Sequence, residues 1–126
     1  MSLDDVLSYL KQQPTAQCAS PIDAVIGLPY PEDYLEFLTK MNGFQWEGLF
    51  LQGLPLQEDQ RLTGKMLYIG YSSDGVIYVY HLHRKCYLEL DKQSLDEFEQ
   101  FDDFFEMLSA LVKEKRELLT ELGIDN

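Results

Sequence analysis

Cysteine, positive charge and long apolar runs are all scarce in this sequence of 126 residues. The two cysteines, Cys18 and Cys86, form no CxxC pair, so a disulfide framework and a cysteine-based zinc site are both disfavoured. No stretch is apolar enough for a membrane-spanning helix, and we find no signal peptide or lipidation motif. We therefore expect a soluble protein of the reducing cytosol with two free thiols.

Basic residues number only 10 against 22 acidic ones, which gives a net charge of −12. Such a field repels nucleic acid and anionic membranes and attracts basic proteins. The charge is concentrated, because segment 89–106 holds eight acidic residues and a single basic one, Lys92, and so carries −7. Solubility alone explains the total, whereas the clustering indicates a surface for a basic partner.

The common catalytic and cofactor motifs are also missing. No G-x-S-x-G, P-loop, G-x-G-x-x-G or H-E-x-x-H occurs. Neighbouring Asp102 and Asp103 would point about a hundred degrees apart on a helix, so we interpret them as a solvated helix start and not as an acid–base pair. We predict no catalytic residue and no cofactor.

His81 and His83 are the residues closest to a metal-binding pattern, because both would lie on one face of a strand. A metal needs a further ligand at suitable spacing, and none is apparent. Ile77 and Val79 fall on the same face, which favours packing. Cys86 and His83 are separated by a tight turn, and nothing indicates that they form a nucleophile and base.

Hydrophobic residues make up 45 % of the chain, enough for one core, so we predict a single domain over residues 1–126. A capping box of Ser2 and Asp5 precedes an apolar stripe at helical spacing, which predicts a first helix ending near Pro14. Proline and glycine positions predict a short helical turn at Pro21–Ile26 and a helix at Pro31–Asn42.

After Gly43 the apolar period changes from 3.6 to 2, which predicts strands at Gly48–Gln52, Lys65–Tyr71, Val76–His83 and Cys86–Leu90. Between them we expect a polar loop at Leu54–Gly64 and tight turns at Ser72–Gly75 and Arg84–Lys85. A long helix should follow from near Phe101 to Leu122, with Ser94 and Glu97 as an alternative cap for an earlier start. The predicted fold is α+β: a mostly antiparallel β-sheet meander, one face exposed, flanked by N-terminal helices and a long C-terminal helix.

Three tyrosines should share one face of this meander, with Tyr78 and Tyr80 on one strand and Tyr87 beside Glu89 on the next. Tyrosine offers a large contact area at low entropic cost, which favours an interface. A helix covering a half-buried sheet explains the same pattern equally well.

Several segments, in order, resemble the SUKH (Smi/Knr-like) superfamily. The run LPYPEDYLEFL at 28–38, followed by Met41-Asn42-Gly43, is similar to its signature helix. Ile69-Gly70 with the turn at 72–75, the strands at 76–82 and 87–91, and the run at 101–108 resemble its following strands and closing helix. The match spans about residues 22–112.

The resemblance implies an α+β fold and a binding function without established catalytic residues. Many bacterial members look like immunity proteins that neutralise polymorphic or contact-dependent toxins, often nucleases. Fungal relatives are linked to the regulation of cell-wall synthesis through protein contacts.

We therefore predict a partner-binding protein, and specifically an immunity protein that blocks a basic toxin domain by stoichiometric binding. The alternatives are a regulatory interaction scaffold and, less favoured, an enzyme of small-molecule metabolism. The candidate surface comprises Ser72, Ser73, Asp74, Tyr78, Tyr80, Tyr87, Glu89, Asp91, Asp96, Glu97, Asp102 and Asp103.

Overall fold

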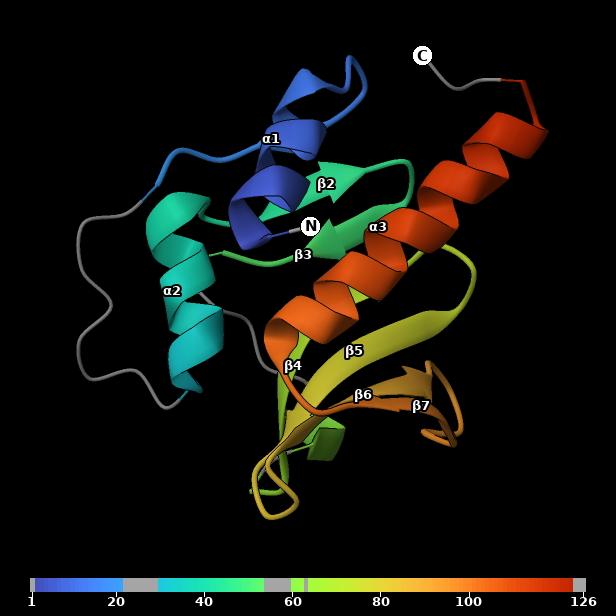
Figure 1. Ribbon diagram of the computed structural model, residues 1–126. Coiled ribbons are helices and arrows are strands. Elements are labelled where there is room, and N and C mark those ends of the chain that lie inside the picture. Colours follow the sequence, from blue (N-terminus) through green and yellow to red (C-terminus); the bar gives the residue numbers. More distant parts are fainter. Residues whose placement is uncertain (1, 22–29, 54–59, 63, 124–126) are drawn as a thin grey trace.

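A computed structural model describes residues 2–21, 30–53, 60–62 and 64–123 of the chain. This part contains three α-helices, one 3-10 helix and a sheet of seven strands (Figure 1). The strands neighbour one another in chain order, and every pair is antiparallel. The predicted α+β fold is therefore confirmed.

Helix α1 (Leu3–Gln12) begins with the predicted capping box. The Asp5 N–H donates to Ser2 Oγ (3.2 Å), and the Ser2 N–H donates to Asp5 Oδ2 (2.9 Å), so the helix start has satisfied donors. Helix α2 (Glu32–Lys40) is shorter than predicted, because Pro31 is its N-cap and Met41 has already returned to extended backbone. The turn predicted at Pro21–Ile26 lies almost wholly outside the described residues.

The strands predicted in the second half are present within one or two residues of the expected bounds. They are β3 (Leu49–Leu51), β4 (Met66–Ser72), β5 (Val76–His81) and β6 (Cys86–Asp91). Gly70 of β4 lies against β3 so closely that a Cβ there would be 3.0 Å from the Leu51 Cα. Only glycine fits this position, which gives the Ile69-Gly70 pair a packing reason.

Three strands were not predicted. They are β1 (Gln17–Cys18), β2 (Phe44–Trp46) and β7 (Glu97–Phe101). Strands β2 and β3 form a hairpin around Glu47 and Gly48, which both have positive φ, as a two-residue hairpin turn of matching twist requires. Of the predicted loop at Leu54–Gly64, residues 54–59 and 63 lie outside the description, and Gln60–Leu62 forms the 3-10 helix η1.

Both faces of the sheet are covered, so the prediction of one exposed face was wrong. The helices cover one face (Figure 1), where Tyr34, Trp46, Tyr87 and Phe104 are all fully buried. A second apolar cluster lies on the other face and contains Leu62, Ile77, Val79, Cys86, Leu88 and Leu90. The tyrosine face therefore packs against helices and does not face solvent.

Helix α3 (Phe104–Glu121) starts three residues later than predicted, because the residues before it pair with β6 as strand β7. Asp103 is its N-cap and accepts from the Glu106 N–H (2.8 Å). Gly123, at φ 73°, follows the end of the helix. Within the described ranges, neither α3 nor any other helix has the apolar length needed to cross a bilayer.

Candidate functional site

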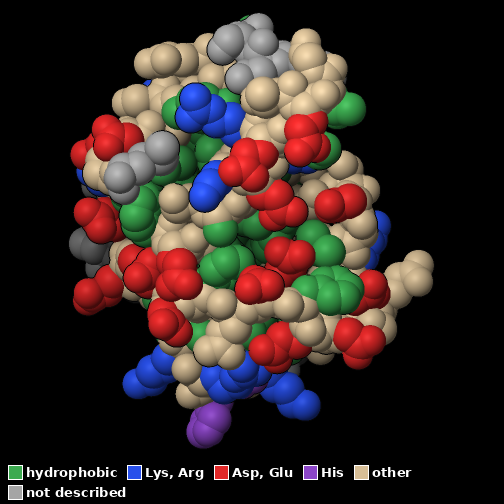
Figure 2. Space-filling model, turned by 45° about the vertical axis from the view of Figure 1, so that its right-hand side comes forward, with side chains coloured by type: hydrophobic (Ala, Val, Ile, Leu, Met, Phe, Trp, Pro, Cys, Tyr) green, Lys and Arg blue, Asp and Glu red, His purple; other side chains and the backbone are tan. Residues whose placement is uncertain are grey.

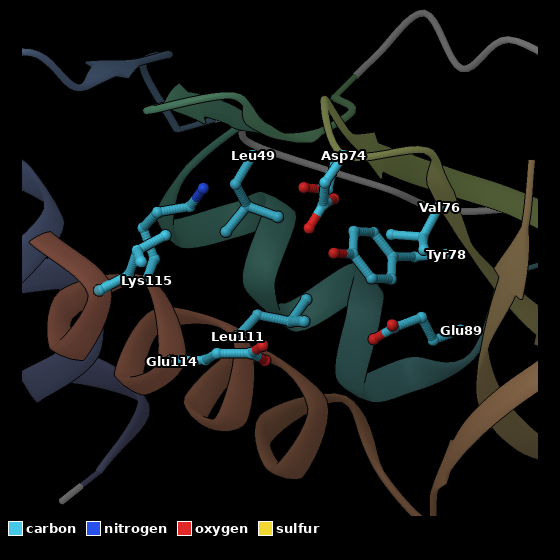
Figure 3. Close-up of a pocket in the computed structure, with 10 residues that line it drawn as sticks. Leu49, Asp74, Val76, Tyr78, Glu89, Leu111, Glu114 and Lys115 are labelled. Atoms are coloured by element: carbon cyan, nitrogen blue, oxygen red, sulfur yellow. The ribbon is translucent and has the colours of Figure 1, made fainter.

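A small cavity lies between the sheet and helix α3 (Figure 3). Its volume is about 70 Å³, and it is lined by Leu49, Ser72, Asp74, Val76, Tyr78, Glu89, Leu111, Glu114, Lys115 and Leu118. Small-molecule sites usually occupy roughly 300–1,000 Å³, whereas one water takes about 30 Å³. The cavity is therefore of a size for a single side-chain end group and not for a metabolite.

Three carboxylates surround this cavity, from three different elements. Asp74 belongs to the β4–β5 turn, Glu89 to β6 and Glu114 to α3, and Figure 3 shows them directed toward the space beside the Tyr78 hydroxyl. Lys115 is the one cation in the lining, and its side chain extends toward Leu49, away from Glu89. Among the described residues, no ion pair joins Lys115 to these carboxylates.

Glu89 occupies the least favourable position for a negative charge. Burial raises the pKa of its carboxyl group, and the charges of Glu114, Asp74 and Glu99 raise that pKa further. The strand register places Glu89 directly opposite Glu99 of β7, and like charges in that arrangement are destabilising. A cation from another molecule would relieve this repulsion.

Tyr78 forms the floor of the cavity and is 3 % exposed. Burial raises the pKa of its hydroxyl far above the usual range, with Glu89 and Asp74 adding to the effect. The hydroxyl therefore stays neutral and can both donate and accept a hydrogen bond. The sequence predicted this side chain for the surface, and the structure places its ring beneath α3.

The cavity brings together four of the predicted site residues, namely Ser72, Asp74, Tyr78 and Glu89. Glu99 lies in the predicted acidic segment next to them, but Glu114 was not anticipated. The sequence feature that could have identified Glu114 is its position in the helical pattern between Leu111 and Leu118, which line the same cavity. Ser73 is exposed on the adjacent turn and does not contribute to the lining.

Other predicted site residues have structural roles that the sequence did not reveal. Asp91 accepts from the Gln93 and Ser94 N–H groups (2.9 and 2.8 Å), which holds a turn and lowers the pKa of Asp91. Glu97 binds the Arg84 guanidinium with both oxygens (2.8 and 3.0 Å), and this pairing lowers its pKa.

Tyr87 and Tyr80 also depart from the predicted exposure. Tyr87 is 1 % exposed, and its hydroxyl donates to Asp33 Oδ1 (2.7 Å). Tyr80 is half-buried against the Tyr87 ring, with 5.0 Å between ring centroids. Asp96 and Asp102 are exposed as predicted, and Asp103 is the N-cap of α3.

Asp33 is a connecting residue that sequence reasoning missed. Besides the Tyr87 hydroxyl, its carboxylate accepts from the Phe104 N–H through Oδ2 (2.7 Å). One side chain of α2 thus fixes β6 and the first turn of α3. The negative charge also lies where the positive ends of two helices meet, an arrangement that stabilises both.

The two histidines do not form the shared strand face that the sequence predicted. Strand β5 ends at His81, whose Nδ1 accepts from the Arg84 N–H (3.0 Å), and His83 is exposed in the turn beyond it. In the part of the chain described, no three histidine, cysteine or carboxylate side chains converge as metal ligands. Cys86 is a buried free cysteine, and burial raises the pKa of its thiol.

The side of the molecule that carries α3 and β7 is mainly acidic. Figure 2 shows carboxylates around hydrophobic side chains there, with basic side chains and a histidine at the lower end and further basic side chains in the upper half. Two leucines of the last helical turns are unusually open, with Leu118 46 % and Leu122 62 % exposed. An apolar centre with a charged surround is the usual anatomy of a protein interface.

Comparison with protein-family models, with curated proteins and with solved structures found no match.

Proposed function

We propose that this chain binds a basic protein partner through an acidic face. We define the acidic face as Asp74, Glu89, Glu99 and Glu114, together with the apolar side chains Leu118 and Leu122. The observation that carries the proposal is the position of Glu89, which is partly buried, opposite a second carboxylate and without a paired cation among the described residues.

A partner with lysine or arginine side chains would satisfy this arrangement. The cationic end group fits the 70 Å³ cavity, and the aliphatic stem can cover the exposed leucines. The field of a protein with net charge −12 would also speed the encounter with a positively charged surface. The same field disfavours nucleic acid as the partner.

The SUKH-like motifs support a narrower form of the proposal. In that form the chain is a cytosolic immunity protein that neutralises a cognate polymorphic or contact-dependent toxin by stoichiometric binding. A nuclease toxin suits the acidic face, because an enzyme that cuts nucleic acid needs a basic cleft. Covering that cleft would deny the substrate access to it.

The experiment is affinity capture from the native cells with three forms of the tagged chain. One is wild type, and one neutralises the acidic face (Asp74→Asn, Glu89→Gln, Glu99→Gln, Glu114→Gln). The third is a control of equal net charge, changed at exposed residues of α1, α2 and the first turn of α3 (Asp4→Asn, Glu32→Gln, Glu36→Gln, Glu106→Gln).

We expect wild type and control to retain one stoichiometric partner whose toxic activity is lost in the complex, and the neutralised form to release it. Several unrelated housekeeping proteins would instead favour the regulatory scaffold. Equal capture by all three forms would show that the acidic face is not the binding surface.

A further inference from the structure

Strand β7 is the last strand in the sheet that the described residues form, and β6 is its paired neighbour. Four of its five residues, Glu97 to Gln100, are exposed. An edge strand presents backbone N–H and C=O groups to which another extended chain can bond. The opposite edge, β1, is only two residues long, so β7 is the better template.

The strand is held in place before any partner arrives. Arg84, from the β5–β6 turn, bonds both oxygens of Glu97 and also the side chain of Gln100. Phe101 at the other end is 8 % exposed and anchors the strand in the core. A strand fixed in this way loses little further conformational freedom on pairing.

The two faces of β7 differ in charge. On the helix-covered face Glu99 stands opposite Glu89, and neither is paired with a cation among the described residues. On the other face Glu97 is neutralised by Arg84, and its neighbour Gln100 is uncharged. An added strand would therefore meet uncompensated negative charge on one face of β7 only, at Glu99.

This pattern selects the occupant. A second copy of the chain would bring its own uncompensated Glu99 to this edge, and like charges that face each other oppose pairing. A strand with a cation at every second residue would instead keep its charges on the face of Glu99, with one of them beside that carboxylate. Phe98 is the extra residue of a bulge in β7 and is 53 % exposed. Its ring offers an aromatic surface to a lysine or arginine side chain.

We propose that β7 accepts an extended basic segment of the partner as an added strand, with its cations facing Glu99. This inference rests on the proposed function and names the binding mode at the same acidic face. The competing interpretation is that the carboxylates and the bulge only guard the edge against aggregation. The two interpretations differ in whether backbone hydrogen bonds form.

The test uses the ¹⁵N-labelled chain and synthetic peptides of alternating lysine and threonine. Three forms are titrated: one unmodified, one N-methylated at every lysine amide, and one N-methylated at every threonine amide. All three carry the same charge, but in a strand the lysine amides point to one edge and the threonine amides to the other. Added-strand binding therefore tolerates methylation of only one set.

We expect the unmodified peptide to shift the amide signals of residues 97–101, and one methylated form to bind at least tenfold more weakly than the other. Glu99→Gln should lower the affinity for the unmodified peptide at least threefold, whereas Glu117→Gln should change that affinity less than twofold. Equal binding of both methylated forms would overturn strand addition. It would remain compatible with binding to the acidic face through charge alone. Absence of any binding would also overturn it, while the capture experiment would still decide the proposed function.

Discussion

The carboxylate of Asp33 accepts hydrogen bonds from two other elements, the Tyr87 hydroxyl of β6 and the Phe104 N–H of α3. Asp33→Asn replaces one acceptor oxygen with a donor and leaves one of these groups unsatisfied. Hydrogen bonds to charged groups are worth about 1.5–3 kcal/mol, so we expect urea unfolding to show a loss of that order. Glu32→Gln, an exposed change in the same helical turn, should alter stability by less than about 0.5 kcal/mol. Similar losses for both variants would contradict this role.

Glu89 and Glu97 should give opposite pH dependences. The pKa of Glu89 is raised in the folded state by burial, so the folded chain binds more protons there than the unfolded chain. Its charge therefore costs stability at about pH 7, and that cost disappears as the pH falls below the ordinary carboxyl range near 4. Glu89→Gln should be more stable than wild type at neutral pH and equal to it at about pH 3.

The pKa of Glu97 is lowered by Arg84, so the sign reverses. Its ion pair contributes stability above the usual carboxyl pKa and loses it as the pH falls through the folded-state pKa. Glu97→Gln should be less stable than wild type at neutral pH, and the difference should vanish in acid. Denaturant midpoints measured between about pH 3 and 7 would check both variants, and trends of the same sign would contradict the assignments.

The start of α3 distinguishes two neighbouring aspartates. Asp103 accepts from the Glu106 N–H, whereas the Asp102 side chain is exposed and caps nothing. Loss of an N-cap typically costs about 0.5–2 kcal/mol, so Asp103→Ala should lower the free energy of unfolding by that amount. Asp102→Ala serves as the matched control and should change it by less than about 0.5 kcal/mol. The reverse order would place the helix start elsewhere.

Elements with a strong local pattern were predictable from the sequence. Helix α1 has its capping box, and β4 to β6 have alternating apolar residues and an Asp-Gly turn. Strand β7 was not predictable, because its sequence EFEQF alternates charge with aromatics on an exposed edge and follows a plausible helix cap. What makes it a strand is pairing with β6 and the clamp from Arg84, and both are tertiary contacts.

The candidate site was only partly predictable. Acidic clustering anticipated that Asp74, Glu89 and the segment 96–103 come close together, and the structure places Asp74 and Glu89 at one cavity with Glu99 opposite Glu89. The exposure of Tyr78 and Tyr87 could not be judged from alternation alone, since a two-sided sheet and a one-sided sheet give the same pattern. Tyr78 and Tyr87 are buried because the apolar stripe of α3 covers that face of the sheet.

At the scale of the whole molecule, the proposed function depends on where the negative charge lies and not on the net charge alone. The four-residue neutralised form of the acidic face and its control of equal net charge differ only in placement. The measurement we would make first is the affinity of both forms, and of wild type, for the captured partner by calorimetry. We expect the acidic-face form to bind at least tenfold more weakly than wild type, about 1.4 kcal/mol, and the control to bind within threefold of wild type. Equal weakening of both forms would contradict a specific acidic face and leave only a general effect of net charge.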